Sequence, residues 1–258
     1  MEDPTRLFRL DGRTAIVTGA SSGLGASFGW TLAAAGARVV LAARRTERIE
    51  ALAQRIAAAG GEAAAIRCDV TVDSEVQALV AAAVERFGPV QILANNAGVA
   101  PEEDGPIESA DSFRRVVAVN LTGAYCCARE VAAVMLEQGG GNIINTASIS
   151  GLVAGDGPDT PSYTATKGAI VSLTRELAVR WAGRGIRVNA LAPGYFPTEM
   201  TESEIETDDG LRFIGERTPL GRPGRVDELQ GALLYLASDA SSYVTGHTLV
   251  VDGGWTAR

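Results

Sequence analysis

Short apolar runs rich in β-branched residues recur along the chain, and longer Ala- and Leu-rich stretches separate them. The runs occupy residues 14–19, 37–43, 63–70, 90–96, 141–148, 186–194 and 247–254, the third being the weakest. Each run has the length of a buried strand, and each separating stretch has the length of a helix. Such alternation is typical of βαβ units, in which helices cover both faces of a parallel sheet. The pattern therefore predicts an α/β fold that binds ligands at the carboxyl ends of its strands.

The composition is that of one folded unit. The chain has 258 residues, of which 46% are apolar, so it is long enough to bury one large core. Its 30 glycines and 10 prolines are spread along the sequence, with no linker, low-complexity block or internal repeat. We expect a single domain over residues 1–258.

Charge and cysteine content exclude several classes of function. The net charge of −8 disfavours binding to nucleic acid or to an anionic membrane. The N-terminal residues lack the apolar core of a signal peptide, and no apolar run reaches the roughly 18 residues of a membrane span. Three cysteines without a CxxC motif, together with one histidine, predict neither a disulfide framework nor a metal site. We expect a soluble, reduced, cytoplasmic protein.

The stretch PSYTATKGAI contains Lys167, the only lysine in a chain that has 22 arginines. Tyr163 precedes it by four residues, so on a helix the two side chains share one face. A free tyrosine has a pKa of about 10, and a cation beside it favours the phenolate. Lysine is a compact charge with three rotatable donors, whereas the guanidinium of arginine is bulkier and rigid. An ordinary helical pair is the alternative, but the retention of one lysine here favours a catalytic tyrosine–lysine pair.

A glycine-rich turn follows the first strand. The segment IVTGASSGLG leads from that strand through three glycines into a helix that starts near Ala26. Glycines at this point let the backbone approach a pyrophosphate, whose charge the free N–H groups of a helix N-terminus stabilise. The spacing differs from the usual GxGxxG, and a ligand-free turn is the alternative. Its place after the first strand favours a dinucleotide site, with contacts expected from Gly19, Ser21, Ser22, Gly23, Leu24 and Gly25.

The end of the second strand bears on which dinucleotide binds. NAD sites usually carry Asp or Glu here, about 20 residues after the glycines, to bind the ribose 2′-hydroxyl. This chain instead has Ala43, followed by Arg44 and Arg45. Arginine suits a 2′-phosphate because its planar fork makes charge-assisted bonds. Two solvated arginines are the alternative, above all for Arg45, and the glycine loop has no second basic residue. We predict that NADP(H) is preferred and that NAD(H) remains possible.

The ordered motifs resemble those of the classical short-chain dehydrogenase/reductase family. From about Gly12 to Trp255 the chain contains, in the family's order, TGASSGLG, CDVT, NNAG, VAVNLTG, NTASISG, YTATK, NALAPGYFPT and TGHTLVVDGG. The resemblance implies a Rossmann-type, doubly wound parallel sheet of about seven strands. It implies hydride exchange between a nicotinamide cofactor and a carbonyl/alcohol pair. It also implies an arm at 1–12, a cofactor-binding and catalytic core at 13–195, a substrate lid at 196–217 and a C-terminal helix and strand at 218–258.

The resemblance also implies roles for individual residues. Ser148 and Tyr163 would hold the substrate oxygen, with Tyr163 as general acid in reduction and its phenolate as base in oxidation. Lys167 would stabilise the phenolate and bind the nicotinamide ribose. Asn120 would hold a water between Lys167 and solvent, although an asparagine that satisfies a helix backbone fits the same position. Further cofactor contacts are expected from Asp69, Val70, Asn96, Ala97, Gly98, Pro193, Gly194, Phe196 and Thr198.

One segment departs from the family pattern, and the substrate is the least determined feature. The stretch from Ser148 to Tyr163 is about two residues longer than the commonest version, which concerns its loop shape more than the catalysis. Residues 198–217 carry seven acids against two arginines, which disfavours strongly anionic substrates. A solvated helix face is the alternative explanation of these acids. Residues 137–142 offer no basic residue for docking an acidic carrier protein.

We therefore expect a small neutral ketone or secondary alcohol as substrate, such as a polyol, a sugar-like compound or a cyclic ketone. One alternative is a 3-oxoacyl-[acyl-carrier-protein] or acyl-CoA reductase. The other is a non-catalytic nucleotide-sensing protein. From the resemblance we also expect a homotetramer.

Overall fold

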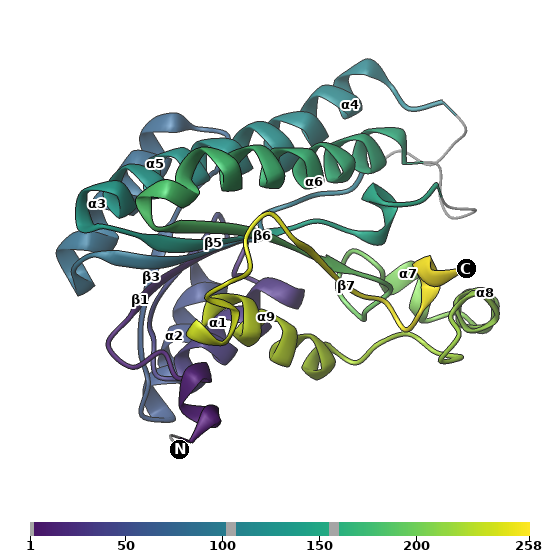
Figure 1. Cartoon of the computed structure of the whole chain (residues 1–258). Coiled ribbons are helices and arrows are strands. Elements are labelled where there is room, and N and C mark those ends of the chain that lie inside the picture. The colour runs from purple at the N-terminus through teal and green to yellow at the C-terminus, as the bar shows by residue number, and fades with distance from the viewer. Residues whose placement is uncertain (1–2, 102–106, 155–159) are drawn as a thin grey trace.

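The computed structural model in Figure 1 describes residues 3–101, 107–154 and 160–258, apart from the side chains of residues 203 and 204. Its centre is a parallel sheet in the order β3-β2-β1-β4-β5-β6-β7. Every strand lies within one of the apolar runs or overlaps it, so the predicted seven-stranded, Rossmann-type sheet is confirmed. The strands are β1 (Thr14–Thr18), β2 (Arg38–Ala43), β3 (Glu62–Arg67), β4 (Val90–Asn95), β5 (Gly141–Thr146), β6 (Ile186–Pro193) and β7 (Thr248–Val251).

Helices cover both faces of the sheet (Figure 1). One face carries α1 (Gly23–Ala34), α2 (Thr46–Ala58) and α9 (Gln230–Ala237), and the other carries α3 (Asp73–Phe87), α4 (Ala110–Val117), α5 (Ala124–Gln138) and α6 (Pro161–Trp181). Successive residues of β1 enter different cores: Ala15 and Val17 pack on the α1 side, and Ile16 packs on the α3 side. The central strands are therefore buried on both faces, which explains why they are continuous apolar runs.

The crossover between β1 and β4 creates the crevice of the fold. The chain leaves β1 toward β3 at one edge of the sheet and returns to β4, which pairs with the other side of β1. Ligands of doubly wound sheets bind at this reversal, beyond the carboxyl ends of the strands. Two short helices, α7 (Glu202–Ile205) and α8 (Asp208–Arg217), follow β6 and lie at the same end of the molecule as the C terminus (Figure 1). Within the described parts of the chain, no helix combines the length and the apolar character that a membrane crossing requires.

Candidate active site

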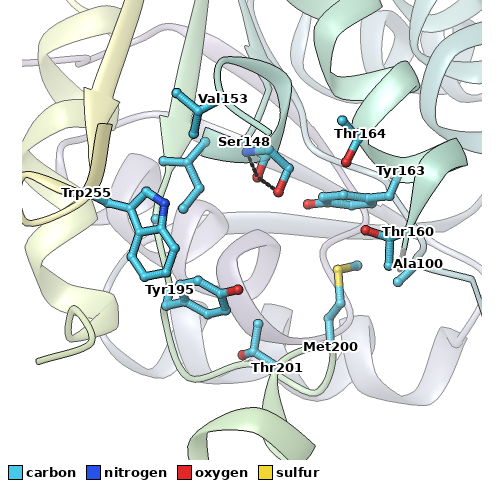
Figure 2. A pocket seen from close by; sticks show the side chains of 13 residues that line it. Ala100, Ser148, Val153, Thr160, Tyr163, Thr164, Tyr195, Met200, Thr201 and Trp255 are labelled. Carbon is cyan, nitrogen blue, oxygen red and sulfur yellow. Dashed lines mark hydrogen bonds between the residues drawn. The ribbon is translucent and has the colours of Figure 1, made fainter. Parts of the chain in front are cut away.

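The two hydroxyl groups expected at the reaction centre converge on one pocket. Ser148 follows β5 and caps the short turn Ile149–Gly151, where the Ser150 N–H donates to Ser148 Oγ at 3.2 Å. Tyr163 lies in the first turn of α6. Figure 2 shows the Tyr163 hydroxyl directed toward Ser148. A substrate oxygen placed between these side chains would meet two O–H groups.

A close backbone contact sets the position of Ser148 relative to α6. A Cβ atom at Gly151 would lie 2.5 Å from the main-chain carbonyl carbon of Lys167, which is too close for any side chain. Glycine at this position therefore lets the turn after β5 rest directly on the backbone of α6. The contact occurs at the residue whose side chain supports Tyr163, so it brings the serine and the tyrosine together.

Lys167 is buried beside the ring of Tyr163. It is 4% exposed, its Nζ donates to the Thr146 carbonyl at 2.7 Å, and the same atom lies 5.5 Å from the centre of the Tyr163 ring. Burial lowers the pKa of Lys167 from 10.5 to about 8, so the ammonium form still predominates at pH 7. The ammonium carries three donors, and residues within the described part of the chain use one of them. The others can serve a bound ribose.

Asn120 joins the loop after β4 to α6. It lies in a π-helical segment, Ala118–Gly123, between α4 and α5, and is 1% exposed. Its Oδ1 accepts from the Val99 N–H at 2.8 Å, and its Nδ2 donates to the Val99 carbonyl at 2.9 Å and to Thr166 Oγ1 at 3.3 Å. Single π-helical turns are rare and occur frequently at functional sites. The backbone that Asn120 satisfies is that of the loop after β4 and not that of a helix, and its role in holding a water stays a prediction.

Glu108, which no sequence motif singles out, fixes the start of α6. Its carboxylate accepts from the Ser162 N–H at 3.0 Å, from Ser162 Oγ at 2.7 Å and from Ser112 Oγ at 2.8 Å. Thr160, the N-cap residue, makes no side-chain cap bond of its own. An acidic group at a helix N-terminus satisfies free N–H groups and complements the helix dipole. Glu108 lies 54 residues before Ser162, so no local spacing could have predicted the contact.

The glycine turn after β1 has a shape that fits a pyrophosphate. A Cβ atom at Gly25 would lie 2.2 Å from the Gly19 carbonyl oxygen, so the first turn of α1 packs closely on this turn. Ser22 is the N-cap residue of α1 and makes no side-chain cap bond, which leaves first-turn N–H groups for a bound anion. The side chain of Leu24 packs against the core beneath α1. The residues present therefore suit a dinucleotide.

Arg45 is not simply solvated, which was the alternative expected for it. Its guanidinium donates to Ser21 Oγ at 3.0 and 3.1 Å, to Ser22 Oγ at 2.6 Å and to Glu199 at 2.9 Å. Arg48 of α2 also pairs with Glu199. Hydrogen bonds from Arg48 and Arg45 lower the pKa of Glu199 to about 2, so the carboxylate is ionised at neutral pH. Arg45 thus ties the glycine turn to the segment after β6.

Arg44 keeps its charge open to a ligand. It is exposed, and within the described residues it makes no hydrogen bond or salt bridge. It follows the end of β2, next to Asp69, which follows the neighbouring β3. Burial raises the pKa of Asp69, but hydrogen bonds from Thr71 and the charge of Arg44 outweigh this effect and lower it. Ala43, which stands where NAD sites carry an acid, is 6% exposed.

The remaining expected cofactor contacts lie at the ends of neighbouring strands. Thr18 Oγ1, at the end of β1, accepts from the Asn96 N–H at 3.0 Å and so holds the turn after β4. Thr198 faces the glycine turn, because a Cβ atom at Gly23 would lie 3.2 Å from the Thr198 Cβ. The ring of Phe196 is buried in the core, so a cofactor would meet its main chain. The same edge of the sheet also contains Val70, Ala97, Gly98, Pro193 and Gly194.

A pocket of about 150 Å³ opens beside Tyr163 and Ser148 (Figure 2). Most of its lining was not among the candidate site residues from sequence. Thr164 and Tyr195 lie within the motifs YTATK and NALAPGYFPT, and Met200 and Thr201 lie within the expected lid, but no pattern singled out their side chains. For Tyr195 and Trp255, the signal that could have found them is their place after the carboxyl ends of β6 and β7. Residues 155–159 of the longer segment before Tyr163 lie outside the described residues. The unpredicted lining includes Thr160, Thr164, Tyr195, Met200, Thr201 and Trp255.

Known proteins resemble the chain over nearly its whole length. A family model described as enoyl-(acyl carrier protein) reductase matches residues 19–256. The chain is 44% identical over 254 residues to galactitol 2-dehydrogenase (L-tagatose-forming) of Cereibacter sphaeroides, covering 98% of this chain and 99% of that protein. It is 40% identical over 252 residues to gluconate 5-dehydrogenase of Gluconobacter oxydans, covering 97% of each. The solved structure of a gluconate 5-dehydrogenase from Burkholderia cenocepacia in complex with NADP and tartrate matches with a TM-score of 0.94 at 39% identity, covering 99% of this chain and 100% of that one.

The ordered motifs, the strand order and these similarities agree. The chain belongs to the classical short-chain dehydrogenase/reductase family. The resemblance inferred from the sequence motifs is thereby confirmed. Because the similarity covers 98% or more of this chain and nearly all of each protein, it includes the glycine turn, α6 and β7 alike.

Replacing Lys167 with arginine tests the importance of the buried ammonium. The space beside the Tyr163 ring and the Thr146 carbonyl holds a compact group, and a planar guanidinium cannot both support a phenolate and bind a ribose. We expect the Lys167→Arg variant to lose turnover by roughly 100-fold or more. Steady-state kinetics would measure the loss, with circular dichroism and thermal unfolding to verify the fold.

Arg180→Lys, an exposed exchange on the same helix, is the matched control and should leave turnover within about twofold of wild type. A folded Lys167→Arg variant with wild-type turnover would contradict the role assigned to the ammonium.

Proposed function

We propose that the protein is an NADP(H)-preferring oxidoreductase that interconverts a ketone and a secondary alcohol. The observation that carries this proposal is the arrangement of Ser148, Tyr163 and Lys167, in which a phenol faces a serine side chain and has an ammonium buried beside its ring. A phenol in this setting can give a proton to a carbonyl oxygen or take one from a hydroxyl. Both named relatives are dehydrogenases, which supports the same class of reaction.

Three side chains carry out the proton chemistry in this proposal. In reduction, Ser148 holds the substrate carbonyl oxygen, and Tyr163 donates its phenolic proton to that oxygen. The charge of Lys167 then stabilises the phenolate, because it lies 5.5 Å from the ring centre. In oxidation, the phenolate takes the proton of the substrate hydroxyl. Asn120 holds the loop after β4 against α6 and so keeps the site in place.

The cofactor half of the crevice would hold a nicotinamide dinucleotide, which supplies the hydride donor or acceptor. The glycine turn after β1 would bind its pyrophosphate, and Arg44 its 2′-phosphate. Lys167 would bind the nicotinamide ribose, and Asp69 with Val70 the adenine. The nicotinamide end would contact Pro193, Gly194, Phe196 and Thr198, while Asn96, Ala97 and Gly98 would lie along the adenosine.

Residues 196–217 are proposed to form the substrate lid of a single-domain enzyme. They include α7 and α8, which lie beyond the carboxyl end of β6. The substrate is proposed to be a small polyol, a sugar-like alcohol or a cyclic alcohol, or the matching ketone. The names of the relatives support a sugar-like alcohol: one refers to galactitol, an uncharged polyol, and the other to gluconate, a sugar acid. A reducing compartment, the cytoplasm, is proposed because Cys68, Cys126 and Cys127 are all free thiols.

A substrate panel tests the proposed reaction. NADPH oxidation would be followed with ketoses, cyclohexanone and an acetoacetyl thioester, and NADP⁺ reduction with galactitol, D-threitol and gluconate. Turnover of a hydroxylated or cyclic substrate is the expected result. Activity confined to the thioester would instead indicate a 3-oxoacyl reductase. Cofactor binding without turnover of any carbonyl or alcohol would indicate a nucleotide-sensing protein.

Cofactor selectivity tests Arg44. The wild type should prefer NADPH over NADH in kcat/KM, since a charge-assisted contact contributes roughly 1.5–3 kcal/mol, or about 10- to 150-fold. Arg44→Ala should weaken the binding of NADPH and leave the binding of NADH nearly unchanged. Ala43→Asp should reverse the preference, because the new carboxylate would accept the 2′-hydroxyl of NADH and repel the phosphate of NADPH.

Arg45→Ala is the matched comparison, because Arg45 holds Ser21 and Ser22 of the turn that both cofactors would share. The Arg45→Ala variant should weaken the binding of NADPH and of NADH to a similar degree. Equal losses of both cofactors in Arg44→Ala, or a wild-type preference for NADH, would contradict the assignment of the 2′-phosphate to Arg44.

A homotetramer is the proposed assembly, built partly on α5 and α6. Apolar side chains on the outer surface of these helices support it: Tyr125 is 42% exposed and Val179 is 81% exposed. Sedimentation at micromolar concentration should show a species of four times the chain mass of 26.8 kDa. Val179→Asp should shift the protein to smaller species. A wild type that sediments only as a single chain would contradict the proposal.

A further inference from the structure

An aromatic surface forms one side of the substrate pocket. Tyr195 follows β6 and Trp255 follows β7, and their ring centres lie 5.1 Å apart at an angle of 51°. Phe213 of α8 packs on Trp255 at 6.1 Å between ring centres. In Figure 2 the Trp255 and Tyr195 rings lie next to each other, across the pocket from Tyr163. We call the pair of side chains of Tyr195 and Trp255 the aromatic wall.

The turn that carries Trp255 is held rigidly. The Asp252 carboxylate accepts from the N–H groups of Gly254 and Thr256 at 2.8 Å, and also from the Thr256 hydroxyl at 2.8 Å. The C-terminal Arg258 donates to the main-chain carbonyl of Glu216, at the end of α8, at 3.2 Å. The C-terminal turn is therefore fixed to the segment after β6. A rigid aromatic surface binds a ligand at a lower cost in conformational entropy than a mobile one.

The described part of the pocket lining is rich in hydroxyl groups. Seven of its 13 described residues, Tyr195 among them, carry a hydroxyl, and none of the 13 is Lys, Arg, His, Asp or Glu. Lys167 is 4% exposed and is not part of the lining. Residues 102–106 and 155–159, which lie outside the described parts of the chain, contain no basic residue in their sequence. Among the described residues, no cationic side chain lines the pocket to balance a substrate carboxylate.

We propose that the aromatic wall receives the C–H face of an uncharged polyol or ketose, and that Trp255 determines the selectivity for such substrates. This inference rests on the proposed function, because it concerns the same pocket. The face of an aromatic ring carries negative potential, which attracts the weakly positive C–H groups of a carbohydrate. The hydroxyl groups around the rest of the pocket can then pair with those of the substrate.

The same features disfavour two other kinds of substrate. A simple alkyl alcohol would gain no hydrogen bonds from the lining beyond those of its single hydroxyl, and sites built to bind a hydroxyl discriminate strongly against analogues that lack it. A sugar acid such as gluconate would lose hydration around its carboxylate without gaining a cation. An uncharged polyol such as galactitol meets neither penalty. The indole N–H of Trp255 makes no hydrogen bond to any described residue, so it can donate to a substrate hydroxyl.

Kinetics with three six-carbon alcohols test the inference. Wild type, Trp255→Ala and Trp255→Phe would be assayed in NADP⁺ reduction with galactitol, gluconate and 2-hexanol. We expect the wild type to prefer galactitol over both others by about 10-fold or more. Trp255→Ala should lower kcat/KM for galactitol about 10- to 100-fold, mainly by raising KM. It should change kcat/KM for 2-hexanol by less than about threefold. Trp255→Phe, which keeps a ring but loses the N–H, should lie between.

A binding measurement that does not depend on turnover separates this inference from the proposed function. In a Tyr163→Phe background with NADP⁺, galactitol should quench tryptophan fluorescence, and Trp255→Phe should abolish the change. Trp181→Phe is the matched control, because Trp181 ends α6 about 27 Å along the helix from Tyr163. Trp181→Phe should leave the galactitol-induced fluorescence change intact.

The kinetic and the binding results together distinguish failure of the aromatic wall from failure of the proposed reaction. No turnover of any substrate, with galactitol quenching that depends on Trp255, would reject the proposed function and support the aromatic wall. If the enzyme turns over alcohols but prefers gluconate to galactitol, the aromatic wall is rejected while the proposed reaction stands. The same conclusion follows if Trp255→Ala lowers kcat/KM equally for galactitol and for 2-hexanol. Absence of quenching together with no effect of Trp255→Ala on galactitol kinetics would also reject the wall.

Discussion

The buried ammonium of Lys167 is the constraint around which the catalytic part of the molecule is arranged. A charge that is 4% exposed is costly unless neighbouring groups compensate for its lost hydration. The Thr146 carbonyl at the end of β5 and the Tyr163 ring provide part of that compensation. Burial lowers the pKa of Lys167 to about 8 without removing its charge at neutral pH. The site thus keeps a cation next to a phenol, where it has the largest effect on the proton affinity of that phenol.

The helix α6 can support this arrangement because three separate contacts hold its first turns. Glu108 caps its N-terminus, Asn120 binds Thr166, and Gly151 packs on its backbone at Lys167. The three contacts come from the segment before α4, from the π-helical turn before α5 and from the loop after β5. Catalytic groups need positions fixed to within about half an ångström, and contacts from several directions achieve this better than one. The position of Ser148 relative to Tyr163 therefore depends on several segments that meet at the carboxyl edge of the sheet.

Sequence patterns predicted the fold, and the ordered motifs indicated the family, because both depend on short-range features of the chain. Burial on both faces makes β1 a continuous apolar run, and the turn between Gly19 and Gly25 needs glycine for a local steric reason. The contacts of Glu108 and Arg45 were not predictable in this way. Each joins residues far apart in the chain, and neither has a fixed spacing. Trp255 ends the matched motif region, yet only the packing of β7 beside β6 shows that it faces the substrate pocket.

The crevice divides into a charged half and an uncharged half, and Glu199 lies where they meet. Arg45 bonds the glycine turn and, with Arg48, pairs with Glu199, while the neighbouring Arg44 is exposed. A dinucleotide bound there would bring several negative charges to these arginines. Among the described residues, the lining of the pocket beside Tyr163 carries no charged side chain, which suits the neutral substrate proposed for it. Glu199 belongs to the segment between them and stays ionised because Arg48 and Arg45 bind it. This carboxylate therefore links the glycine turn to the chain that leads into α7 and α8. The position of that chain thus depends on Arg45, the same residue that bonds the turn.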